Sequence, residues 1–141
     1  MPTAAVVYRS AKGTTRRYAE DMGAYLESRG VTTAVQSVGE ADVALLAGVD
    51  ILLFGCWTSG LLVIGQHPDE PWLAFARDLP PLPRARVGLF TTYKLATGSM
   101  FPRMRAALAA KAPRVEVELK SRDGHLSNAG RAALDRLVGL A

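Results

Sequence analysis

Short apolar runs alternate along this chain with segments of helical periodicity, and this alternation constrains the fold more than any other feature. Runs rich in β-branched and large apolar residues predict strands over Ala4–Tyr8, Val31–Val38, Asp50–Gly55, Ala85–Phe90 and Val115–Leu119. Apolar residues at three- and four-residue steps predict helices over Thr15–Arg29, Pro71–Leu79, Met100–Ala110 and Asn128–Leu140, with a short helical turn at Asp42–Leu46. Because short connections in such an alternation favour parallel strands and right-handed crossovers, we predict an α/β fold. It is a three-layer sandwich around a five-stranded parallel sheet, formed by residues 1–141 as a single domain.

The strands differ in pattern, and this places two of them. Asp50–Gly55 is nearly all apolar, as expected for a central strand covered on both faces. Val31–Val38 alternates apolar and polar residues, which is typical of a strand near a sheet edge.

The sparse reactive residues exclude several kinds of site. Cys56 is the only cysteine, so an intrachain disulfide, a thiolate cluster and a Cys-x-x-Cys motif are excluded, and redox chemistry would need a cofactor. His67 and His125 lack the spacing of metal ligands, and we interpret them as solvated loop residues. Ser59 is outside a Gly-x-Ser-x-Gly elbow. We assign neither a metal nor a catalytic residue.

Charge and hydropathy limit the partners. Lys and Arg total 17 against 13 acidic residues, a net charge of +4 that favours anionic ligands or an acidic partner surface. The basic residues are scattered without a nucleic-acid-binding motif, so no nucleic acid is expected. No apolar run approaches the roughly 20 residues of a membrane span. The chain opens without a basic region and cleavage site of the secretory type, so we expect a cytoplasmic protein.

Polar loops follow three of the predicted strands, at Ser10–Thr15, Cys56–Gly60 and Thr91–Gly98. The carboxyl ends of parallel strands meet at one edge of the sheet, where ligands bind in folds of this class. This edge is therefore the candidate site.

The first of these loops has the components of a phosphate cradle. Ser10, Thr14 and Thr15 supply hydroxyls, Lys12 a cation and Gly13 flexibility, just before a predicted helix N-terminus. The alternative is that Ser10 and Thr14 only cap that helix. The spacing is neither that of a nucleotide P-loop nor of the dinucleotide glycine motif, and the short loop suits one monophosphate.

The segment Tyr8–Thr15 resembles the phosphate loop of the flavodoxin family, Ser/Thr-x-Thr-Gly-x-Thr, with matches at Ser10, Gly13 and Thr15. Lys12 stands where the family usually has threonine. The resemblance continues in order through nearly the whole chain. Asp50–Cys56 is similar to the third flavodoxin strand, and Val87–Tyr93, followed by Gly98, is similar to the fourth strand and the third flavin loop.

This resemblance implies a flavodoxin-like fold, FMN held non-covalently, and electron transfer. Gly60 falls at the glycine beside the flavin ring, whose peptide in the family turns over to hydrogen-bond the reduced flavin. The residues expected to hold FMN are Ser10, Ala11, Lys12, Gly13, Thr14, Thr15, Trp57, Thr58, Ser59, Gly60, Thr91, Thr92, Tyr93 and Gly98.

Two departures from the family concern the ring and its rim. Leu95 stands where many flavodoxins stack an aromatic residue on the flavin ring, which leaves Tyr93 and Trp57 for that role. The alternative is that Tyr93 is an ordinary tyrosine at a strand end and that Trp57 only anchors its loop. Flavodoxins usually carry an acidic rim, whereas this chain is basic. The apolar segment Leu61–Ile64 is expected to dock an unknown redox partner or to tuck under the next helix.

We therefore predict an FMN-binding electron-transfer protein, a redox carrier rather than a substrate-specific oxidoreductase. Two alternatives remain open. One is a cofactor-free flavodoxin-like binding module, which Leu95 and Lys12 favour. The other is an FMN-dependent oxidoreductase acting on a quinone- or porphyrin-like substrate, with Leu61–Ile64 as part of its surface.

Overall fold

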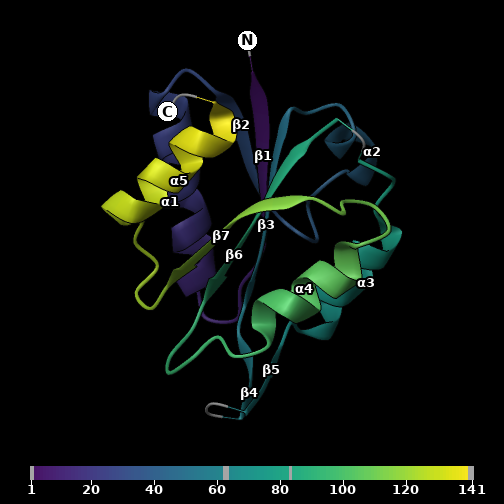
Figure 1. Ribbon diagram of the computed structural model, residues 1–141, viewed down its shortest axis with the longest axis vertical. Helices are drawn as coiled ribbons and strands as arrows, with labels where there is room; N and C mark the ends of the chain where they lie inside the picture. The colour runs from purple at the N-terminus through teal and green to yellow at the C-terminus, as the bar shows by residue number, and fades with distance from the viewer. Residues whose placement is uncertain (1, 62–63, 83, 140–141) are drawn as a thin grey trace.

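The computed structural model describes residues 2–61, 64–82 and 84–139, and it has the predicted α/β architecture. One parallel sheet contains β1 (Thr3–Arg9), β2 (Thr32–Ser37), β3 (Ile51–Trp57), β6 (Arg86–Thr92) and β7 (Val115–Ser121). The helices are α1 (Thr14–Ser28), α2 (Val43–Leu46), α3 (Glu70–Asp78), α4 (Met100–Leu108) and α5 (Asn128–Val138). Helices α1 and α5 cover one face of the sheet, and α3 and α4 cover the other (Figure 1). The predicted sandwich with a five-stranded parallel sheet is confirmed.

The strand order is β2-β1-β3-β6-β7, which places the nearly all-apolar β3 at the centre and the alternating β2 at an edge, as predicted. The order reverses direction at β1 and β3, because β2 lies on one side of this pair and β6 and β7 lie on the other. In doubly wound sheets this reversal opens a crevice at the carboxyl ends of the strands.

Two apolar layers sandwich the sheet, because successive strand residues point to opposite faces. In β1, Ala5 and Val7 pack toward α3 and α4, whereas Ala4 and Val6 pack toward α1 and α5. The helices contribute large buried side chains to these layers, namely Tyr18, Met22 and Leu26 from α1, Trp72 and Phe75 from α3, Met104 and Leu108 from α4, and Leu134 and Leu137 from α5.

The strand ends lie further along the chain than predicted, so the expected loops at Cys56–Gly60 and Thr91–Gly98 are shorter. Cys56 pairs with Thr91 and Trp57 with Thr92, which extends β3 and β6 by keeping their ladder of hydrogen bonds intact. The ladder continues one step further, where the Thr58 N–H donates to the Thr92 carbonyl at 2.9 Å.

A second departure is an antiparallel hairpin of β4 (Ser59–Leu61) and β5 (Ile64–His67) between β3 and α3, where no strands were predicted. In Figure 1 it projects beyond the carboxyl ends of the main sheet. Leu61 pairs with Ile64, while residues 62 and 63 of the apolar segment Leu61–Ile64 lie outside the described residues. His67 therefore lies in a strand and not in a loop, whereas His125 is an exposed loop residue as predicted. Within the described ranges, no helix has both the length and the hydropathy needed to cross a bilayer.

A glycine in the central strand allows an aromatic ring to lie against the sheet. A Cβ built on Gly55 would overlap the ring of Phe90, which is itself fully buried and meets Tyr18 edge-on with ring centroids 5.9 Å apart. The Gly55→Ala substitution should therefore lower the free energy of unfolding by about 1–3 kcal/mol, measured by chemical denaturation. Gly39→Ala is the matched control, since the nearest atom to its Cβ would be the Ser37 Oγ at 3.9 Å. Equal stability of the two variants would contradict this account.

Candidate functional site at the carboxyl edge of the sheet

A cavity of about 760 Å³ lies at the carboxyl ends of the strands, within the range of roughly 300–1,000 Å³ usual for small-molecule sites. The three predicted loops converge on it, joined by the hairpin and by the segment after β7. The lining residues are Ala11, Lys12, Thr14, Thr15, Trp57, Thr58, Ser59, Gln66, Thr92, Tyr93, Lys94, Leu95, Ala96 and Arg122. The sheet thus brings most of the predicted site residues together around one cavity.

The first loop leaves the N-terminus of α1 open toward this cavity. Gly13 is the N-cap residue in a left-handed conformation, φ 97°, and no side chain caps the helix. The Ser10 Oγ accepts the Gly13 N–H at 3.0 Å, so it closes the turn before the helix. Thr14 is the first residue of the helix. The alternative in which Ser10 and Thr14 serve only as helix caps is therefore wrong, and the first N–H groups of α1 have no i−4 carbonyl to bond.

Threonine hydroxyls join the elements beneath the cavity. The Thr15 Oγ1 lies 2.6 Å from the Thr92 Oγ1, and both side chains are buried, so α1 is linked directly to the end of β6. Thr91 is fully buried, and its hydroxyl lies 2.6 Å from the Cys56 carbonyl oxygen and 2.7 Å from the Thr58 Oγ1. Thr91, which is among the predicted site residues, therefore braces β3 against β6 with its hydroxyl and is not among the lining residues.

The two predicted aromatics both line the cavity, and each is held by its neighbours. The indole Nε1 of the half-buried Trp57 donates to the Asp69 Oδ2 at 2.7 Å. The Tyr93 N–H donates to the Ser121 carbonyl at 3.2 Å, which ties it to β7. The two interpretations of Trp57 are therefore compatible, because its side chain is anchored by a neighbouring residue and also lines the cavity.

Asp69 connects three elements behind the Trp57 wall. Its Oδ2 also accepts the Arg9 Nε at 2.8 Å, and its Oδ1 accepts the Trp72 N–H at 3.2 Å as the N-cap of α3. The carboxylate therefore ties the end of β1, the end of β3 and the start of α3 together. A charge-assisted network of this kind fixes the Trp57 ring in one orientation.

Several lining residues were not among the predicted site residues; some come from the unpredicted hairpin or from the segment after β7, and others from within the predicted loop Thr91–Gly98. Gln66 is 2% exposed and comes from the unpredicted hairpin. A Cβ on Gly98 would meet the Gln66 amide, with the Gln66 Cδ 2.9 Å away, so Gly98 packs behind the wall and is not in the lining. Lys94, Ala96 and Arg122 also line the cavity. Arg122 follows the last strand, and the rule that strand ends converge would have identified it.

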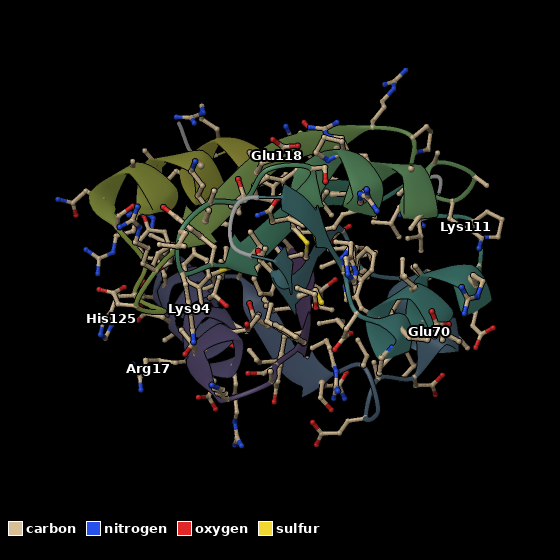
Figure 2. All side chains as sticks on the ribbon, turned by 90° about the horizontal axis from the view of Figure 1, so that it is seen from below. Arg17, Glu70, Lys94, Lys111, Glu118 and His125 are labelled. Carbon is tan, nitrogen blue, oxygen red and sulfur yellow. The ribbon has the colours of Figure 1, made fainter. Side chains whose placement is uncertain are left out.

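The cavity walls carry cations and no carboxylate among the described lining residues. Lys12, Lys94 and Arg122 are all exposed. Figure 2 looks onto this end of the molecule, with Lys94 and Arg17 toward the side of α1 and α5, and Glu70 toward the opposite side with α3. The described residues contain no cluster of three or more His, Cys, Asp or Glu side chains suited to a metal ion.

Comparisons with known proteins agree with this fold. A family model described as flavodoxin matches residues 6–111. A short-chain flavodoxin associated with a bacterial microcompartment superposes with a TM-score of 0.75 and 21% identity, covering 99% of this chain and 95% of that one. The two-electron reduced flavodoxin of Megasphaera elsdenii gives 0.75 and 19%, covering 98% and 99%. Rubredoxin oxygen:oxidoreductase from Desulfovibrio gigas gives 0.71 and 11%, covering 98% of this chain but 34% of that one.

Removing the Asp69 carboxylate should cost more than removing an ordinary helix cap. We expect Asp69→Ala to lower the free energy of unfolding by about 2–4 kcal/mol, since it removes the α3 cap and the partners of Arg9 and Trp57. Asp42→Ala, which removes the cap of the short, largely exposed α2, should cost at most about 1 kcal/mol. Urea denaturation of both variants measures the difference, and similar losses would show that the Asp69 network adds little.

The Cys56 thiol should be inert in the folded protein. It is fully buried with its Sγ 3.7 Å from the Asp69 Oδ1, and burial raises the pKa of the thiol, so the reactive thiolate is suppressed at neutral pH. Iodoacetamide should label Cys56 rapidly only after unfolding in guanidinium, as followed by mass spectrometry. Rapid labelling of the native protein at neutral pH would contradict the packing described here.

Proposed function

The chain belongs to the flavodoxin family, and from that premise we propose that it holds FMN non-covalently in the carboxyl-edge cavity and serves as an electron carrier. The observation that carries the proposal is one cavity with an uncapped helix N-terminus and a lysine at one part of its lining, and two anchored aromatics at another. These are the components that a phosphate and a planar ring require.

The phosphate would lie against the loop from Ser10 to Thr15. Its donors are the first N–H groups of α1, the Thr14 hydroxyl and the Lys12 ammonium. The left-handed backbone of Gly13 lets the loop turn into the helix, and open space surrounds its Cβ position. The Ser10 hydroxyl acts indirectly, because it holds the Gly13 N–H and so fixes the shape of the loop.

The ring would lie between the walls formed by Trp57 and Tyr93. Asp69 fixes the indole, and β7 fixes the backbone of Tyr93, so both walls are ordered before a ligand arrives. Leu95 adds an apolar contact at the mouth and is 55% exposed.

FMN, when bound, supplies chemistry that accepts and donates electrons one or two at a time. The contribution of the chain is orientation and electrostatics. Lys12, Lys94 and Arg122 stabilise negative charge in the cavity, whereas an acidic rim would oppose it. Several lining residues, Lys12, Lys94 and Arg122 among them, are exposed, which leaves room for a partner to approach the site, as an electron carrier requires.

A phosphate-specific contribution to binding tests the proposal. We expect FMN to bind more tightly than riboflavin, because only FMN engages the loop. Lys12→Gln should weaken FMN binding about 10- to 100-fold and leave riboflavin binding nearly unchanged, since a hydrogen bond to a charged group contributes about 1.5–3 kcal/mol. Quenching of flavin fluorescence measures both affinities.

Arg84→Gln is the matched control, since it removes an exposed cation that precedes β6 at the opposite edge of the sheet. It should change neither affinity. Failure of the wild-type protein to bind FMN or to shift its visible absorption spectrum would overturn the proposal and favour the cofactor-free binding module.

A further inference from the structure

A group of cations lies on the face of the molecule around the cavity mouth without acidic partners. Lys94, Lys120 and Arg122 are exposed, and within the part of the chain that the structure describes none of them has a carboxylate within 4.0 Å. On the same strand as Lys120, by contrast, Glu116 pairs with Arg86 and Glu118 pairs with Arg105. We call Lys94, Lys120 and Arg122 the cationic rim.

The cationic rim is organised by Tyr93. The Lys120 Nζ lies 5.7 Å and the Arg122 Cζ 5.4 Å from the centroid of the Tyr93 ring, which is within the range of cation–π attraction. Lys94 is the next residue in the chain after Tyr93. Because one ring holds two cations in place, part of the entropy cost of fixing them for a partner is already met.

Asp123, which follows Arg122 in the chain, is hydrogen-bonded within its own loop. The Asp123 Oδ1 accepts the His125 N–H at 2.9 Å and the Ser121 hydroxyl at 3.0 Å. These hydrogen bonds, first that from His125, lower the pKa of the Asp123 carboxyl, so it stays charged but is directed at its own turn. The rim keeps a net positive charge.

An apolar side chain completes this surface. Leu95 is one of two large apolar residues that are strongly exposed among the described residues, and it follows Lys94 directly. An apolar contact beside a charged rim is the usual anatomy of a protein–protein interface. Nucleic-acid surfaces instead need an extended basic stripe, which the scattered arginines of this chain do not provide.

We propose that Leu95 and the cationic rim form the docking surface for a protein partner with an acidic patch around an apolar contact. The proposal rests on the proposed function only in that the partner would then be a redox protein. It places docking at the end of β7 and the segments after β6 and β7, whereas the sequence predicts docking at Leu61–Ile64. Opposite charges would steer the encounter and make its rate depend on salt.

Binding of a fluorescein-labelled oligoglutamate peptide tests the rim. Fluorescence anisotropy measures this binding to the protein before and after FMN is added. We expect Lys94→Gln/Arg122→Gln to weaken peptide binding about three- to tenfold at low salt, with the difference lost at high salt. The matched control, Arg84→Gln/Arg114→Gln, removes the same charge at the opposite edge and should change binding less than about twofold. Circular dichroism establishes that both variants fold.

A second peptide with one internal leucine tests Leu95. It should bind more tightly than plain oligoglutamate, and Leu95→Ser should abolish that difference. The proposed docking surface would be overturned if both double variants weakened peptide binding equally. It would also be overturned if a single-stranded oligonucleotide bound more tightly than the peptide and Lys94→Gln/Arg122→Gln lost that binding. The FMN titration is read separately. If the peptide binds the rim but the protein does not bind FMN, only the proposed function is contradicted. If the protein binds FMN but both double variants weaken peptide binding equally, only this inference is contradicted.

Discussion

The parallel pairing of β3 with β1 on one side and with β6 on the other is the constraint on which the site depends. It carries Cys56 and Trp57 alongside Arg9 and Thr92, so the segments that leave these strands start from one edge. The close approach of the Phe90 ring to Gly55 holds this central pair in register beneath the cavity. A slip of one residue would turn Trp57 away from the cavity, because alternate strand residues face opposite sides.

Polar side chains then convert this edge into a shaped cavity. Loops held by few contacts are mobile, and the entropy lost in ordering them weakens ligand binding. Here Thr15 is joined to Thr92, and Thr58 to Thr91, so neighbouring elements are fixed to each other at the strand ends. Asp69 does the same behind Trp57. The lining side chains are thus joined to each other or, as with Trp57 and Asp69, to side chains behind the lining.

Much of this arrangement could be predicted from the sequence, because its signals are local. Apolar runs and helical periodicity define the layers, and the Ser10–Thr15 motif locates one wall of the cavity. The hairpin of β4 and β5 was missed because residues such as Gln66 and His67 carry no strand signal. Thr91 was assigned to the ligand because a motif gives position in the chain but not the direction of a side chain. Thr91 pairs with Cys56 in the sheet, and its side chain is buried.

The distribution of paired charges carries information that the net charge does not. A charge of +4 spread evenly over the surface would favour no particular partner. In this fold Glu116 and Glu118 lie on β7, where they neutralise Arg86 and Arg105. The same strand then places Lys120 at its end and Arg122 just after it, beside Tyr93. The strand therefore carries these ion pairs along its length and the cations of the rim at and after the end that borders the cavity, where docking is proposed.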